Sequence, residues 1–135
     1  MTEFTIGRLA KQTGLATETL RYYERRGLIA PHQRTASGYR LYRREAFQRL
    51  RFIRRAQALG FSLDEIAELL ALSDDPDQSA AVVKQFTRAK IQDIESRIRD
   101  LERMKRGLAA LESHCPGHGP TSECPILAAL NAEDE

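Results

Sequence analysis

Two cysteines near the C-terminus are the residues of this chain best suited to chemistry. Cys115 and Cys124 are separated by eight residues that include two glycines and two prolines. Such a segment can bend so that the two thiolates converge on one soft cation. Cys124 also precedes a short helix predicted from Pro125 to Asn131, and the N–H groups at a helix N-terminus lower the pKa of a thiol. In a cytoplasmic chain, a close pair of this kind is more often a metal or redox site than a structural disulfide.

Two histidines, His114 and His118, stand on either side of the first cysteine. We expect each to be a solvated loop residue. The alternative is that they join the cysteines in a Cys₂His₂ set, which can complete a tetrahedral zinc site. A disulfide between Cys115 and Cys124 is a further alternative, and it would make the chain a thiol redox sensor.

A long helix must position this loop. From Ala80 to Glu112 the chain has no proline, and no glycine before Gly107, which predicts a helix roughly 50 Å long at about 1.5 Å per residue. Its apolar residues are spaced 3-4-3, as in the seam of a two-helix coiled coil. The seam residues are Ile91, Ile94, Ile98 and Leu101, followed by Leu108. We expect this seam to be buried against a second copy of the chain, with packing along its own domain as the alternative. The pattern does not choose between parallel and antiparallel helices.

The first part of the chain has the spacing of a helix-turn-helix. A short helix is predicted from Ile6 to Gln12 or Thr13, ended by Gly14, and a second from Ala16 to Arg26 with Thr17 as its N-cap. The second helix is expected to present Thr17, Thr19, Arg21 and Tyr22 outward and to turn Leu20 and Tyr23 inward. Two short helices joined in this way are common outside DNA-binding proteins, so the next segment decides the interpretation.

That segment is predicted to form a short hairpin with Ser37 and Gly38 in its turn. Its tip carries Arg34, Tyr39 and Arg40. A basic, aromatic hairpin directly after a helix-turn-helix is typical of a wing that contacts DNA phosphates and the minor-groove edge. Helices from Arg44 to Leu59 and from Leu63 to Leu72 are expected to follow.

Charge separates the two parts of the chain. Arg8 to Arg55 holds 13 basic and three acidic residues, whereas the segment from Ser73 onward holds eight basic and 12 acidic residues. A polyanion is therefore the natural partner of the first part. We expect a cytoplasmic protein, because no apolar run of membrane-spanning length and no signal peptide stands out. We do not expect an enzyme, because no paired carboxylates, nucleophile and base, or phosphate-binding loop stand out.

Five motifs, taken in order, resemble the MerR family of transcriptional regulators. They are Arg21-Tyr22-Tyr23-Glu24, Gly27-Leu28-Ile29, Gly38-Tyr39-Arg40-Leu41-Tyr42, Leu50-Arg51-Phe52-Ile53-Arg54 and Leu59-Gly60-Phe61-Ser62-Leu63-Asp64-Glu65-Ile66. The resemblance runs from Thr5 to about Leu130. It implies a homodimer with two winged helix-turn-helix heads on an antiparallel coiled coil. It also implies binding to double-stranded promoter DNA, which such a dimer twists and bends so that RNA polymerase can use an overlong spacer.

Matched position by position, the resemblance implies DNA contacts from the second helix, the wing and the helix after it. These contacts would come from Thr17, Arg21, Tyr22, Arg34, Tyr39, Arg40 and Arg54. Tyr23 and Tyr42 are expected to pack inside the head instead.

The resemblance also concerns the metal. The run from Cys115 to Leu127 is similar to that of the copper-efflux regulators, with an insertion in its middle. Divalent-metal members of the family carry a third cysteine at the start of the long helix and copper sensors a serine, whereas this chain has Ala80 with Ser79 beside it. This favours Cu(I), Ag(I) or Au(I) held by Cys115 and Cys124. A sensor of zinc, or of cadmium, lead or mercury, is the alternative.

The predicted fold is therefore all-α with a small β-hairpin wing. Residues 1–75 are expected to form a winged helix-turn-helix DNA-binding domain. Residues 76–112 are expected to form the dimerisation helix, and residues 113–135 a metal-binding loop with a short C-terminal helix.

Overall fold

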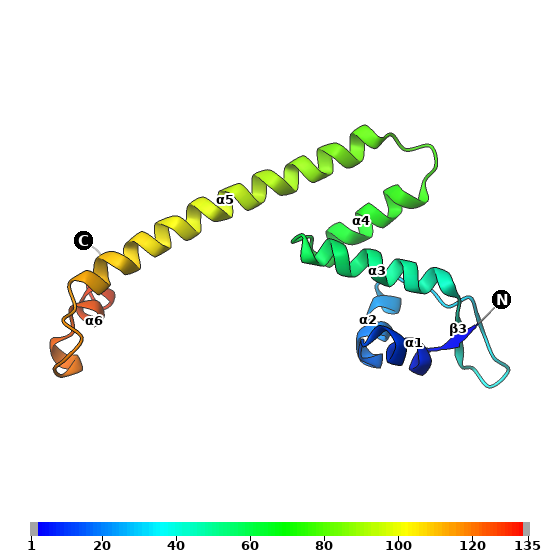
Figure 1. The fold of residues 1–135 in the computed structure, drawn as a ribbon, viewed down its shortest axis with the longest axis horizontal. Coiled ribbons are helices and arrows are strands. Elements are labelled where there is room, and N and C mark those ends of the chain that lie inside the picture. The colour runs from blue at the N-terminus through cyan, green and yellow to red at the C-terminus, as the bar shows by residue number, and fades with distance from the viewer. Residues whose placement is uncertain (1–2, 134–135) are drawn as a thin grey trace. The chain divides into compact units, whose positions relative to one another are not determined.

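The computed structural model describes residues 3–133 of the chain (Figure 1). Residues 1–2 and 134–135, at the outer limits of the first and last predicted domains, lie outside the described residues. The chain divides into two compact units, Met1–Phe86 and Thr87–Glu135. The predicted fold class is confirmed: the elements are mostly helices, with one small antiparallel sheet.

The first unit begins with two helices joined by a tight turn. In α1 (Ile6–Thr13) the Thr5 side chain caps the N-terminus by accepting from Arg8 N, and Gly14 ends the helix at φ 75°. A residue with a Cβ is strained at that angle, which explains a glycine there. α2 (Thr17–Arg25) follows. The prediction that Thr17 is its N-cap was wrong, because Ala16 has the extended backbone of a cap and Thr17 is already helical.

A three-stranded antiparallel sheet has the order β1-β3-β2. β2 (Gln33–Arg34) and β3 (Arg40–Tyr42) form the predicted hairpin, with Gly38 in the turn at φ 90°. The sequence did not predict β1 (Phe4–Thr5), which pairs Phe4 with Tyr42 and Thr5 with Leu41. A two-residue strand is too short to show an alternating pattern.

Two further helices complete the core of the first unit. They are α3 (Arg44–Ala58) and α4 (Leu63–Asp74). α4 begins with a capping box in which Ser62 Oγ accepts from Glu65 N while the Glu65 carboxylate accepts from Ser62 N. The core draws buried apolar side chains from the four helices, from β3 and from the segment after α2. Its largest fully buried members are Leu9, Leu20, Leu28, Tyr42, Leu50, Ile53 and Ile66.

The helix α5 (Ala80–Ser113) is unbroken over 34 residues (Figure 1). It confirms the predicted long helix to within one residue. After it come a turn of 3-10 helix, η1 (Thr121–Glu123), and a short helix, α6 (Pro125–Leu130), which has proline in its first turn. Among the residues described, no helix is both long and apolar enough to cross a membrane.

Candidate nucleic-acid interface and metal centre

The helix α2 presents an exposed row of polar and aromatic side chains. Arg21 and Tyr22 are exposed and Thr17 is half-buried, whereas Leu20 and Tyr23 are buried, as predicted. Arg21 Nη1 lies 3.0 Å from Glu18 Oε1, one helical turn back. Both side chains of this pair are exposed, so Arg21 can leave the pair for another anion at little cost.

Tyr22 is held in place by two arginines of the same helix end. The guanidinium carbons of Arg25 and Arg26 lie 5.8 Å and 5.7 Å from the centre of the Tyr22 ring. Arg26 Nη1 also donates to the Tyr22 hydroxyl oxygen at 2.8 Å, and Arg26 Nη2 pairs with Asp64 of α4. Because the Tyr22 oxygen accepts this bond, its own proton remains available for an outside acceptor such as a phosphate.

The wing is a rigid turn with an exposed aromatic tip. Thr35 N donates to Tyr39 O at 2.7 Å, and the Thr35 hydroxyl accepts from Tyr39 N at 3.0 Å. These bonds close the turn and leave the Tyr39 side chain 68% exposed. Arg34 is exposed, whereas Arg40 is half-buried.

Arg40 and Tyr42 of β3 share one carboxylate on α2. Arg40 Nε donates to Glu24 Oε1 at 2.7 Å, and the Tyr42 hydroxyl donates to Glu24 Oε2 at 2.7 Å. The hydrogen bond to Glu24 raises the pKa of Arg40. Burial raises the pKa of Tyr42, and its hydrogen bond to Glu24 raises it further. The sequence predicted that Tyr42 is buried but not that it pairs with Glu24.

Three arginines of α3 surround a hollow of about 360 Å³ beside the end of α1. Arg54, the predicted DNA contact, donates from Nη1 to the Thr13 carbonyl oxygen at 3.3 Å. Arg51 and Arg55 line the same hollow and were missed as candidates. Their spacing from Arg54, three residues before and one after on one helix, was the available signal. A hollow lined by three arginines suits an anion such as a DNA phosphate.

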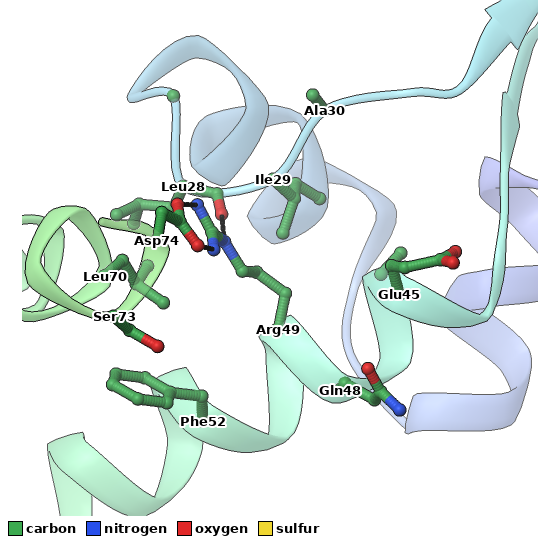
Figure 2. Close-up of a pocket in the computed structure, with 12 residues that line it drawn as sticks. Leu28, Ile29, Ala30, Glu45, Gln48, Arg49, Phe52, Leu70, Ser73 and Asp74 are labelled. Atoms are coloured by element: carbon green, nitrogen blue, oxygen red, sulfur yellow. Dashed lines mark hydrogen bonds and ion pairs between the residues drawn. The ribbon is translucent and has the colours of Figure 1, made fainter. Parts of the chain in front are cut away.

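A second hollow of about 510 Å³ lies between α3, α4 and the segment after α2, and an arginine crosses it (Figure 2). Arg49 Nε donates to the Leu28 carbonyl oxygen at 3.0 Å, and Arg49 Nη1 and Nη2 donate to the two Asp74 carboxylate oxygens at 2.8 Å and 2.9 Å. The Arg49 guanidinium lowers the pKa of Asp74. Because these groups satisfy one another, we assign the arrangement to holding the end of α4 in place.

The two cysteines lie in the segment after α5, and both are free and half-buried. Positive φ angles at Gly117 (78°) and Gly119 (93°) let the loop turn back on itself. The backbone N–H groups of Leu127 and Ile126, and the Cys115 thiol, lower the pKa of Cys124. The direction of the Cys124 pKa agrees with the prediction, whereas the convergence of the two sulfurs on one metal ion stays a prediction.

The two histidines are exposed, and the bond of His114 is to the backbone of α5 and not to a cysteine. His114 Nδ1 lies 2.6 Å from the Ala110 carbonyl oxygen, and both His114 and His118 are exposed. Within residues 3–133, no three His, Cys, Asp or Glu side chains are grouped closely enough to hold a metal ion. Within the described part of the chain, the two cysteines therefore have no third ligand of these types grouped with them.

The predicted seam of α5 is exposed in the single chain. The exposed fractions are 51% for Ile91, 38% for Ile94, 53% for Ile98, 61% for Leu101 and 66% for Leu108. Met104 is 61% exposed and extends the same row. An apolar row of this length along a solvent-facing helix is typical of a surface that another helix covers.

A winged helix-turn-helix with exposed basic and aromatic side chains defines a class of DNA-binding regulators. The chain belongs to the MerR family of helix-turn-helix regulatory proteins. The sequence profile described as "MerR HTH family regulatory protein" matches residues 4–73, and the one described as "MerR, DNA binding" matches residues 47–111.

The similar proteins include regulators named for different metals or operons. The mercuric resistance operon regulatory protein of Bacillus cereus is 44% identical over 128 residues, which are 95% of this chain and 97% of that protein. The regulator CueR of Escherichia coli O6:H1 is 39% identical over 126 residues, 93% of each chain. The structure of PbrR691 from Ralstonia metallidurans CH34 in complex with lead(II) has a TM-score of 0.84 and 35% identity, and the match covers 93% of this chain and 97% of that one.

Proposed function

We propose that this protein is a metal-responsive transcriptional regulator that binds a palindromic promoter site as a homodimer. A soft metal ion bound by Cys115 and Cys124 would switch the dimer to a form that distorts the DNA and activates RNA polymerase. The observation that supports the metal part is that the two cysteines lie in one glycine-containing loop, in which the Leu127 and Ile126 N–H groups and the Cys115 thiol lower the pKa of Cys124.

The DNA part rests on the head. Arg21, Tyr22 and the wing tip residue Tyr39 are exposed, and Arg54 borders a basic hollow next to α1. In this arrangement Thr17, Arg21 and Tyr22 of α2 enter the major groove. The wing residues and Arg54 contact phosphates, which position the head without reading sequence. The exposed row on α5 provides the dimer contact, and two heads related by a two-fold axis require a two-fold operator.

We propose Cu(I), or the similar ions Ag(I) and Au(I), as the metal. Thiolate ligands favour soft monovalent ions of this kind. Two thiolates and one monovalent cation leave a net charge of −1, which the N–H groups of Leu127 and Ile126 at Cys124 help to offset. Zinc requires about four ligands, whereas the described residues contain no group of three His, Cys, Asp or Glu side chains that could hold a metal ion, and position 80 is alanine.

A divalent ion is the second candidate, and two of the similar proteins support it. The mercuric resistance operon regulator is 44% identical to this chain, and the lead(II) complex of PbrR691 superposes with a TM-score of 0.84. His114 and His118 would add ligands if the loop rearranged around zinc. A disulfide between Cys115 and Cys124 would instead make the switch an oxidation.

A competitive titration with bathocuproine separates these possibilities. Reduced, chelator-treated protein should withdraw one Cu(I) ion per chain from the chelator, and Cys115→Ser and Cys124→Ser should each abolish this uptake. The matched control is the double variant His114→Ala/His118→Ala, which should keep it. Uptake of zinc with none of Cu(I), and its loss in the double histidine variant, would replace the monovalent site with the divalent one.

A further inference from the structure

We propose that Glu24 is a positioning residue for DNA binding: it aims Arg40 at a DNA phosphate and fixes the wing against the recognition helix. The inference rests on the proposed DNA-binding function and specifies how the head is organised to perform it. Glu24 is an acidic residue on α2, the helix that would face DNA. A carboxylate in that place by itself opposes binding to a polyanion.

Each carboxylate oxygen of Glu24 has its own partner on β3. Oε1 accepts from Arg40 Nε at 2.7 Å, and Oε2 accepts from the Tyr42 hydroxyl at 2.7 Å. The Glu24 side chain is only 16% exposed. Charge-assisted bonds this short and this shielded from water hold their partners in defined orientations.

The network connects the recognition helix to the middle strand of the sheet. Tyr42 is fully buried and pairs in register with Phe4, so β3 is anchored to the core at this end. Arg40 pairs in register with Arg34 on the other strand of the wing. Glu24 therefore ties α2, which carries Arg21 and Tyr22, to the strand from which the wing extends.

The pairing also orients the Arg40 guanidinium. It uses the Nε edge of the group, and 33% of the Arg40 side chain remains exposed. A guanidinium held at Nε can direct its terminal nitrogens to an anion outside the head, because its donors form a fixed planar fork. Glu24 thus acts on DNA through Arg40, and the local charge of the carboxylate is compensated by that same arginine.

The direction in which Glu24→Gln changes the affinity for DNA tests this inference. Glu24→Gln removes a negative charge from the DNA-facing side, so charge alone predicts tighter binding at low salt. Positioning predicts the opposite, because glutamine offers one acceptor in place of two and no charge to hold Arg40. We expect the affinity for a duplex selected by the wild-type protein from a random-sequence library to fall roughly tenfold, as for loss of one charge-assisted contact.

The salt dependence distinguishes positioning from a general loss of structure. The logarithm of the association constant decreases as the logarithm of the salt concentration rises. If Arg40 no longer contacts its phosphate in Glu24→Gln, this slope should become shallower by about 0.9 per head. Arg40→Gln, at a partly exposed position, should give the same fall. The double variant should bind no more weakly than Arg40→Gln, because Glu24 acts through that residue. Glu68→Gln, an exposed carboxylate on α4, is the charge-matched control and should leave affinity and slope close to those of the wild type.

Thermal unfolding by circular dichroism checks that each variant folds. Suppose that the wild type binds the selected duplex. A Glu24→Gln variant that binds it as tightly or more tightly, or with the same salt dependence, would then overturn this inference and leave the proposed function standing. Additive losses in the double variant would also overturn it. Absence of selected binding by the wild type would overturn both.

Discussion

Replacing Ile98 with aspartate tests the dimer at the middle of its seam. The Ile98 side chain is 53% exposed in the single chain. Burying an isoleucine completely contributes about 1.5–3 kcal/mol, so covering the remaining half contributes about 1 kcal/mol in each chain. The substitution loses this burial twice in a homodimer. It also places two carboxylates in an apolar contact, at several kcal/mol for each unpaired charge.

The total exceeds about 4 kcal/mol, which raises the dimer dissociation constant at least about a thousandfold. Sedimentation equilibrium at micromolar concentration should therefore give a wild-type dimer and a monomeric Ile98→Asp variant, each with helical circular dichroism. Ser96→Asp adds the same charge at an exposed position two residues away, outside the seam, and should remain dimeric. A monomeric wild type, or a dimeric Ile98→Asp variant, would refute the assignment of this row as the dimer contact.

Three further predictions concern the head and the thiols. Arg21→Ala should relax sequence preference and cost roughly 1–3 kcal/mol of binding free energy on the preferred site, whereas Arg54→Ala should weaken binding to all duplexes about equally. Selection from random sequences distinguishes the two variants. An equal loss of sequence preference in both would contradict the assignment of Arg21 to bases and Arg54 to phosphates. The Arg49 guanidinium lowers the pKa of Asp74, so this pair stabilises the fold above the unfolded pKa of about 3.9, and its contribution is lost as the pH falls through the lower folded pKa. Asp74→Asn should therefore cost under about 1 kcal/mol in urea unfolding at neutral pH, since this carboxylate is exposed, and the difference should vanish in acid; a constant difference would be inconsistent with the ion pair. The lowered pKa of Cys124 predicts half-maximal alkylation in the reduced, metal-free protein below the value of about 8.5 for an ordinary cysteine, and mass spectrometry of the alkylated peptide would reveal a higher midpoint.

Local signals in the sequence predicted most of the helices. Ser62 followed by Glu65 predicted the start of α4, and the structure contains the corresponding capping box. The absence of proline predicted α5, which is unbroken from Ala80 to Ser113. The cap of α2 was misplaced by one residue, because threonine is favoured both as a cap and in the first turn. β1 was missed because its two residues become a strand only by pairing with Leu41 and Tyr42, far along the chain.

The candidate site was predicted where its residues are close in sequence. Cys115 and Cys124 lie within one loop, and the glycines between them, which have positive φ, are the basis for the prediction that the thiols converge. The contacts of Glu24 with Arg40 and Tyr42 join residues 16 and 18 positions apart. Arg49 and Asp74 are 25 positions apart. Such pairs depend on how elements pack, and no local pattern in one sequence encodes them.

The central claim is that a soft monovalent ion on Cys115 and Cys124 activates transcription. Run-off transcription by RNA polymerase tests it most directly, from a promoter with the selected operator in its spacer and with Cu(I), Ag(I), Zn(II), Hg(II) or Pb(II) added in turn. The proposal predicts activation by Cu(I) and Ag(I) for the wild type and for His114→Ala/His118→Ala, and none for Cys115→Ser or Cys124→Ser. Activation by a divalent ion with no response to Cu(I) or Ag(I), or full activation of either cysteine variant, would contradict it.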